Sequence, residues 1–368
     1  MNYRNVDWGA TGRRDSYSFA LVDPFTLSET GPAQVEAGGA SLTWSYDSDN
    51  QAQGFITMRG DSYQQDGFFR MVRVYDSVTV GEWSSKVALA TLFVGNASTE
   101  SKNHSSSRRL SCYGPMWRFT QDYLDQDFVA RVGDNACDKI RSLIEGVGGI
   151  VRFEGVDMGR THTRDVFFPI GHNRADAIYE YVGWIGAEVV TEPDGSLLVR
   201  PYEAFDSRAP VYTFEAGRNC VYLGGIEWST NRDEPRNRVV AYFSRESKQD
   251  DDPYPLADSV TLDLPSSYAL SYERCGRRTT HVLQVTDPCS HEDLRAQAQR
   301  YMDQSSGAHL DIIIEHVGIP FLRVGDCVDF ENEADMEQPF RQRCVVMEMS
   351  AQGLGPGCMT QSKLRTLR

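Results

Sequence analysis

Alternating apolar and polar side chains predict strands in the first hundred residues. In residues 41–50, Leu42, Trp44 and Tyr46 share one face, and polar side chains occupy the other. This period of two is typical of a strand with one buried face. The same pattern, or a short apolar run, occurs in residues 17–22, 53–60, 68–75 and 87–95. A β-rich beginning of the chain is therefore predicted.

The last third of the chain returns to the same pattern and adds one helix. Strands are predicted at residues 236–244, 310–317 and 341–350. Turn residues lie between them. Residues 289–304 have helical spacing, with Ser290 and Asp293 placed as in a capping box. The sequence contains no exact internal repeat, but the β-rich style of both ends suggests two related folds.

The middle third has helical spacing instead. Apolar residues recur every three or four positions in residues 134–149 and 172–187. Asn173 is placed to cap the second helix, and Gly186 to end it in the left-handed conformation. One stripe of this helix is predicted to face a core: Ala175, Ile178, Val182 and Ile185.

A short hairpin is predicted directly after this helix, at residues 188–203 (EVVTEPDGSLLVRPYE). Pro193 presets the turn, and Gly195 can adopt positive φ there. We expect the helix stripe to cover one face of the hairpin, which would make a small α/β module from local contacts. The serine-rich residues 96–109 are predicted to be an exposed loop and a domain boundary.

Length, composition and charge narrow the function classes. A chain of 368 residues exceeds the usual size of one core, which predicts two or three domains. Lys and Arg number 37 and Asp and Glu 52, so the formal net charge is −15. This negative charge argues against nucleic-acid binding, which needs clustered cations, and against binding to an anionic membrane. It is compatible with a surface past which DNA slides.

The cysteine pattern favours a protein of a reducing compartment, and the apolar runs indicate neither a signal peptide nor a membrane span. The eight cysteines contain no CxxC pair, so free thiols are expected rather than a disulfide framework. The N-terminus lacks the apolar core of a signal peptide. The longest apolar-rich run, residues 87–95, is too short to cross a bilayer.

Residue types that carry catalysis do not fall into a known arrangement. An HExxH pattern begins at His291, but Arg295 stands where the second histidine would bind zinc. His162, Asp165 and His172 lie near each other with a spacing that matches no standard zinc site, so surface polar residues are the favoured interpretation.

Nucleophile and phosphate motifs are also missing from the sequence. It has no GxSxG elbow and no Gly-Lys-Ser/Thr phosphate loop. A cysteine–histidine pair or a pair of glycosidase carboxylates stays open, because sequence alone cannot place such residues together. We predict no catalytic, cofactor-binding or metal-binding residue and no enzymatic activity.

Several segments in a fixed order carry a family resemblance. They include the turn VDPFTLSETG, the strand ending in SYDSD, the helix and hairpin ending in VRP, and the late segment RVGDCVDF. Their order resembles that of the baseplate hub, or tail-tip, proteins of tailed bacteriophages and prophages. The matching segments span most of the chain, at residues 19–31, 38–61, 133–149, 174–203, 236–243, 323–330 and 347–365.

The resemblance implies an α+β, β-rich fold. Two β-barrel-like ring domains are expected at residues 1–110 and 226–368, and a peripheral α/β domain at residues 111–225 on the outside of the ring. Hubs of this family are trimers, in which the paired domains form a pseudo-sixfold ring that matches the hexameric tail tube above and presents threefold symmetry below.

The resemblance also implies a structural role without catalytic residues or cofactors. A homotrimer would cap or extend the tail tube at the virion tail tip, conduct DNA, and assemble in the host cytoplasm. Expected partners are a tail-tube or distal tail protein above and a fibre, spike or tape-measure protein at the tip. Neither a membrane nor specific nucleic-acid binding is expected. The negative charge predicts a carboxylate-lined lumen that repels DNA phosphates over about 8 Å.

Two other functions remain as alternatives. A tail-associated cell-wall hydrolase would need a cleft with convergent carboxylates or a cysteine–histidine pair. The chain has the size of a hub core without an added peptidase, lysozyme or fibre domain, which counts against this alternative. A receptor- or glycan-binding tail protein would need an exposed aromatic platform, whereas the six tryptophans are scattered.

Overall fold

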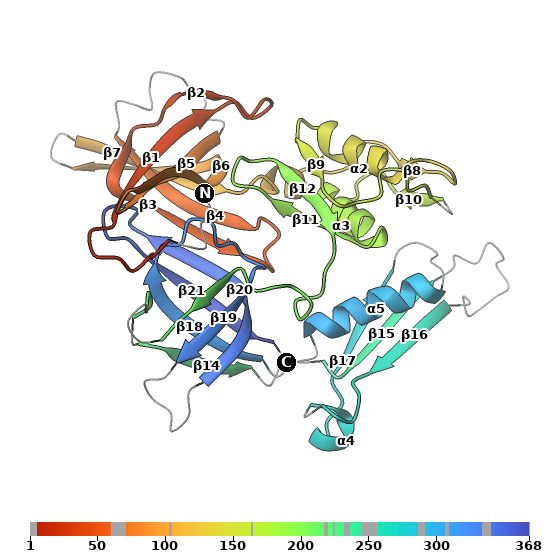
Figure 1. The fold of residues 1–368 in the computed structure, drawn as a ribbon. Coiled ribbons are helices and arrows are strands. Elements are labelled where there is room, and N and C mark those ends of the chain that lie inside the picture. The colour runs from red at the N-terminus through yellow and green to blue at the C-terminus, as the bar shows by residue number, and fades with distance from the viewer. Residues whose placement is uncertain are drawn as a thin grey trace.

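The computed structural model shows a β-rich α+β protein in which a few helices accompany large antiparallel sheets (Figure 1). The predicted fold class is confirmed at that level. The structure describes residues 6–59, 71–102, 105–162, 165–216, 220–223, 225–231, 236–244, 257–268, 270–285, 291–305, 309–332 and 340–367.

One large sheet combines strands from both ends of the chain. Its N-terminal strands are β1 (Arg14–Val22), β2 (Glu29–Pro32), β3 (Val35–Ser45), β4 (Ala52–Arg59), β5 (Met71–Val80), β6 (Trp83–Lys102) and β7 (Ser105–Tyr113). Its other strands are β13 (Tyr212–Phe214), β14 (Glu227–Asn231), β18 (His309–Val317), β19 (Cys327–Asn332), β20 (Phe340–Gln352) and β21 (Met359–Thr366). The order is β14-β18-β21-β20-β3-β4-β7-β6-β5-β1-β2, and β19 pairs with β13 and β20 off this path.

The two sets of strands join where β20 pairs antiparallel with β3. The register runs from Glu348 opposite Ser45 to Gln352 opposite Ser41. One apolar core lies on each side of the junction, and Trp44 packs against both. Backbone hydrogen bonds therefore make the two ends of the chain one continuous sheet. The described pairings trace an open path, so the closure of two barrels stays a prediction.

The serine-rich stretch is not a loop, and that prediction was wrong. Residues 96–102 continue β6, and β7 returns beside it, with Ser98 opposite Arg109. The polar composition did not reveal that β7 also pairs with β4. The Arg109 guanidinium lies 3.5 Å from the Phe55 ring centroid, a cation–π contact that holds β7 against β4.

The middle unit, residues 117–201, lies beside the large sheet (Figure 1). It contains α1 (Trp117–Thr120), β8 (Phe128–Ala130), α2 (Ala136–Glu145), β9 (Val151–Phe153), β10 (Val166–Phe168), α3 (Arg174–Trp184), β11 (Ala187–Thr191) and β12 (Leu197–Pro201). One small sheet has the order β11-β12-β9, and β8 pairs with β10 in another.

The local signals of the middle unit are confirmed. The Asn173 side chain accepts hydrogen bonds from the backbone N–H groups of Ala175 and Asp176, so it caps α3 as predicted. Gly186 has φ 71° and Gly195 has φ 91°, the left-handed conformations that the helix end and the hairpin turn require. The predicted stripe of α3 is buried, and α3 packs on β11.

A third unit, residues 236–305, lies within the range predicted for the second ring domain but has its own sheet and core. It contains β15 (Arg238–Ser244), β16 (Ala257–Asp263), α4 (Tyr272–Cys275), β17 (Thr280–Gln284) and α5 (His291–Ser305), with the sheet order β16-β15-β17. Helix α5 covers one face, where Val239, Ala241, Val260, Leu294 and Ala298 are buried. The predicted cap at Ser290 lies outside the described residues.

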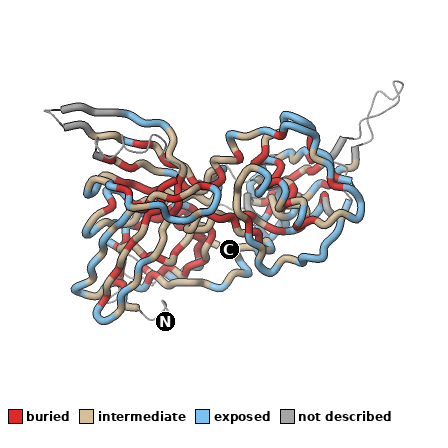
Figure 2. Tube along the Cα trace, turned by 90° about the horizontal axis from the view of Figure 1, so that it is seen from above, coloured by how far each residue is buried: buried red, intermediate tan, exposed pale blue. Residues whose placement is uncertain are grey.

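Buried residues fill the interior of the molecule and exposed residues gather at its periphery (Figure 2), and the middle and third units each have a core of their own. The seven cysteines in the described part of the chain are free thiols, as predicted for those positions. No helix within the described residues is both long enough and apolar enough to span a membrane.

Candidate functional site

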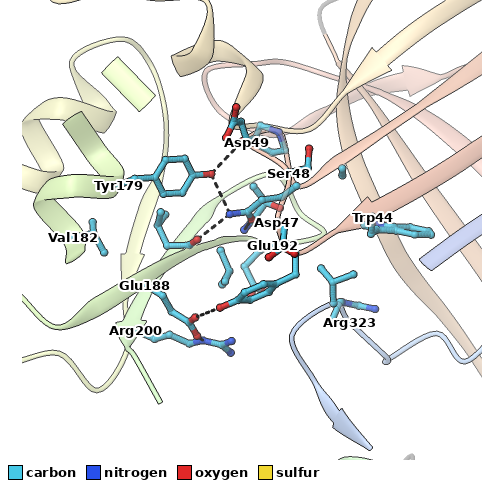
Figure 3. Close-up of a pocket in the computed structure, with 18 of the residues that line it drawn as sticks. Trp44, Asp47, Ser48, Asp49, Tyr179, Val182, Glu188, Glu192, Arg200 and Arg323 are labelled. Atoms are coloured by element: carbon cyan, nitrogen blue, oxygen red, sulfur yellow. Dashed lines mark hydrogen bonds and ion pairs between the residues drawn. The ribbon is translucent and has the colours of Figure 1, made fainter. Parts of the chain in front are cut away.

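A cavity of about 380 Å³ lies where the large sheet, the middle unit and the loop before β19 meet (Figure 3). Tyr46, directly after β3, lines it from the sheet, Glu188 of β11 from the middle unit, and Arg323 from the loop. The volume is within the range of small-molecule pockets, about 300–1,000 Å³. We call the interface between these parts the seam. The contacts across it decide whether the cavity is a reactive site or lies in a rigid joint between units.

Gln51 ties the large sheet to the hairpin. Its side-chain oxygen accepts a hydrogen bond from the Thr191 backbone N–H at 2.7 Å, and its Nε2 donates to the Val189 carbonyl at 3.0 Å. Tyr179 of α3 donates to the Asp49 carbonyl at 3.1 Å from the same side. Gln51 has φ 55°, an unusual conformation for a residue with a side chain, and this backbone geometry aims the amide at β11.

Glu188 is the centre of a half-buried ionic cluster. Its carboxylate accepts hydrogen bonds from Tyr46 Oη at 3.0 Å, Arg200 Nε at 2.8 Å and Arg208 Nη2 at 3.0 Å. Burial and the adjacent Glu188 charge both raise the pKa of the Tyr46 hydroxyl. Arg208 also donates to the Gly325 carbonyl at 3.0 Å, so the cluster joins the middle unit to both parts of the large sheet.

The turn of the hairpin sits on the large sheet. Arg73 of β5 donates to the Asp194 carbonyl at 2.7 Å, and Thr91 of β6 donates to the Pro193 carbonyl at 2.7 Å. A Cβ atom on Gly195 would lie 3.1 Å from side-chain atoms of both Leu27 and Thr91. Gly195 in the sequence EPDG therefore provides both the positive φ of the turn and the space for a close approach between the units.

Gly195→Ala is expected to lower the free energy of unfolding by about 2–4 kcal/mol, because left-handed strain and crowding against Thr91 both contribute. Gly133→Ala is the matched control: its φ is 89°, and its Cβ would meet nothing within 4 Å. Chemical denaturation of both variants separates the two terms, and we expect Gly133→Ala to cost only about 1–2 kcal/mol. Equal losses would show that the turn makes no tight contact with the sheet.

The seam is built as a fixed joint. The Glu188 carboxylate accepts all three of its hydrogen bonds from side chains of the interface itself. Arg323 Nη1 is engaged as well, donating to the Pro320 carbonyl at 2.7 Å and the Leu322 carbonyl at 2.9 Å. These contacts hold the side chains in place where the units meet.

The residues singled out for metal chemistry do not come together. His162 bonds to the Tyr181 hydroxyl, and Asp165 accepts the Val132 backbone N–H at 2.8 Å. His172 stacks on Phe168. Within the described ranges, no group of three or more His, Cys, Asp or Glu could hold a metal ion. His291, at the start of α5, lies 3.2 Å from an Asp258 carboxylate oxygen instead.

Sequence reasoning missed Gln51, Glu188 and Arg73 as joint residues. The Gln51 and Thr191 partners are 140 positions apart, and Arg73 and Asp194 are 121 apart. Local patterns carry no information about such pairs. The one available signal was Glu188 itself, an acidic residue at the start of a hairpin strand whose other positions are mostly apolar.

A second, smaller cavity of about 40 Å³ lies between the two parts of the large sheet, beside Asp76 of β5. Asp76 is 2% exposed, and its Oδ1 has no hydrogen-bond partner within the described part of the chain. Burial and the neighbouring Asp15 raise the pKa of this carboxyl to about 7, although Arg13 opposes the shift. Tyr17 and His316 line the same cavity.

His316 contributes no charge to this region. Its Nδ1 donates to the Val317 carbonyl at 2.7 Å, and its Nε2 accepts from the Ser362 hydroxyl at 2.8 Å. Burial lowers the pKa of the imidazole to about 4, so it is neutral at physiological pH. Asp76 is therefore the group near this junction whose charge changes close to neutral pH.

Comparisons with known proteins identify the fold. No known protein family matches the sequence, and no curated protein sequence matches it. Solved structures do match. The tail protein from Neisseria meningitidis MC58 has a TM-score of 0.63 and 13% identity, over 95% of this chain and 96% of that one. The 43 kDa tail protein of prophage MuSo2 from Shewanella oneidensis has a TM-score of 0.59 and 10% identity, over 97% and 98%.

A third matching structure is a component of a bacterial secretion system. An E. coli component of the type VI secretion system, described as structurally similar to the T4 tail proteins gp27 and gp5, has a TM-score of 0.50. Its identity is 8%, over 92% of this chain and 74% of that one. The resemblance predicted from the sequence is confirmed at the level of the fold: this chain has the fold of phage and prophage tail proteins.

Proposed function

We propose that this chain is a structural protein of a phage or prophage tail, and that three copies form the hub ring at the tail tip. The observation that carries the proposal is the match over nearly the whole length of both chains to two tail proteins. The hydrogen-bonded ionic cluster of Glu188, which links the middle unit to the large sheet, also supports a structural role.

The ring would use the strands from both ends of the chain. Residues 1–110 and 226–368 are proposed as the two barrel-like ring halves, and residues 111–225 as the peripheral domain. The pairing of β3 with β20 supports this division, because it places the two halves side by side in one sheet. The hydrogen bonds of Gln51 and Glu188 would then keep the peripheral domain in a fixed position on the ring.

The proposed ring conducts DNA and contacts other tail proteins along its axis. The net charge of −15 supports a lumen that repels phosphates, since a wall rich in carboxylates lowers the adhesion of DNA during passage. A tail-tube or distal tail protein would bind above, and a fibre, spike or tape-measure protein below. We place the chain at the virion tail tip after assembly in the host cytoplasm.

Immunogold electron microscopy tests this location. An antibody against the purified chain is applied to tailed particles from cells that express the protein, and mass spectrometry quantifies the chain in the same particles. We expect label at the tail end distal to the capsid, with about three copies per particle. Label on the capsid, or particles that lack the chain, would contradict a tail-tip function.

A further inference from the structure

Exposed apolar side chains concentrate in one part of the middle unit, residues 123–170. Of the eleven large hydrophobic residues most exposed in the described part of the chain, six lie between residues 123 and 170. Ile170 is 64% exposed, Val132 63% and Tyr123 57%; the other three are Val129, Met158 and Phe167. Single exposed apolar residues are ordinary on protein surfaces, but a group of them marks an interaction site.

Most of these residues lie on one antiparallel ribbon, which we call the outer ribbon: residues 123–132 and 165–170. β8 and β10 form its centre, where Val129 is directly opposite Phe167. Directly opposite residues point to the same face of a sheet, so these two side chains are neighbours. Phe128, Ala130, Val166 and Phe168 point the other way and pack in the core of the middle unit.

Two aspartates extend the ribbon beyond its strands and hold further exposed apolar residues at its two ends. Asp127 accepts the Ile170 backbone N–H at 2.8 Å, and Asp165 accepts the Val132 backbone N–H at 2.8 Å. Ile170 and Val132 are therefore held at opposite ends of the central pair. The central pair and both ends of the ribbon therefore rest on hydrogen-bonded backbone. Figure 1 shows β8 and β10 at the end of the middle unit away from the large sheet.

The exposed charged residues of the outer ribbon itself are mainly negative, although Lys139 of α2 donates to the Val129 carbonyl at 2.9 Å. The described residues of the outer ribbon carry three exposed carboxylates, Asp125, Asp127 and Asp165, and one exposed cation, Arg131. A second copy of this ribbon is a poor occupant, because the like charges of the two ribbons would repel. Charge complementarity favours a partner that brings cations to the edges of an apolar contact.

We propose that the outer ribbon docks a different protein, through a segment whose apolar or aromatic anchors are flanked by Lys or Arg. The anchors pack on Val129, Phe167 and Ile170, and the cations approach Asp127 and Asp165. This surface lies on the outside of the middle unit and adds to the axial contacts of the proposed function. Its test does not require a ring, so either proposal can fail while the other stands.

Selection from a displayed library of random short peptides tests the proposal on the purified full-length chain. We expect enriched sequences to combine apolar or aromatic anchors with flanking Lys or Arg. The peptides are then synthesised, and their affinities are measured by fluorescence anisotropy at low and physiological salt. Phe167→Ser combined with Ile170→Ser should weaken binding by about tenfold or more, because hot-spot anchors dominate such interfaces.

Two further variants separate charge from apolar contact. Asp127→Asn combined with Asp165→Asn keeps the oxygen atoms that accept the backbone N–H groups, and it should weaken binding a few-fold and remove most of its salt dependence. Val282→Ser is the matched control, since Val282 is 56% exposed on β17 of another unit, and it should leave binding unchanged. Failure to enrich peptides, enriched peptides without cations, or affinities indifferent to the serine variants would each overturn the proposal.

Discussion

Replacing Glu188 with alanine is expected to lower the free energy of unfolding by about 3–5 kcal/mol, the cost of breaking a buried ion pair. The carboxylate accepts hydrogen bonds from Tyr46, Arg200 and Arg208, and the Arg208 side chain is only 10% exposed. Without Glu188, a buried guanidinium would lose its counter-charge while remaining out of water. Urea denaturation of the wild type and the variant, followed by circular dichroism, measures the loss.

Two controls isolate the cluster. Glu145 on α2 makes an exposed pair with Arg141 at 3.9 Å, and Glu145→Ala should cost no more than about 0.5 kcal/mol. The double variant Glu188→Ala with Arg208→Ala should cost less than the sum of the two single changes, because it leaves no buried unpaired charge. Strictly additive losses, or a Glu188→Ala variant as stable as wild type, would show that the cluster does not hold the units together.

The second large effect is a fall in stability as pH rises from about 4 to about 7, caused by Asp76. Folding raises the pKa of this carboxyl from its ordinary 3.8 to about 7. The folded protein therefore binds a proton that the unfolded chain has released between about pH 4 and pH 7. The stability that this proton provides is complete below about pH 4 and is lost as pH rises to about 7, by up to about 4 kcal/mol.

Asp76→Asn removes this titration while nearly preserving the shape of the side chain. The difference in unfolding free energy between wild type and Asp76→Asn should favour the wild type more at pH 5 than at pH 8. Asp138→Asn serves as the control, because its side chain is 70% exposed on α2 and its replacement should leave the pH profile unchanged. A pH profile that is the same for wild type and Asp76→Asn would exclude Asp76 as the titrating group.

Local signals predicted the parts of the fold that depend on neighbours in sequence. The cap at Asn173, the left-handed glycines and the hairpin turn all involve residues a few positions apart, and the structure confirms them. The prediction of a loop at residues 96–109 failed because a polar composition is typical of loops, whereas strand formation there depends on pairing between β4, β6 and β7.

The joint between the units could not be predicted in the same way. Tyr46 and Glu188 are 142 positions apart, and neither lies in a local sequence pattern that identifies the other as its partner. The order of weak segments carried more information than any one of them. It identified the phage-tail fold that the solved structures confirm, at identities of 13% and below.

Cryo-electron microscopy of the tail end of particles that contain this chain tests the ring most directly. The account predicts three copies around the tail axis, with residues 1–110 and 226–368 alternating at about 60° in a pseudo-sixfold ring and the middle unit outside it. The lumen should be lined mainly by carboxylates. A single copy, a ring in which the two halves do not alternate, or a basic inner wall would contradict it.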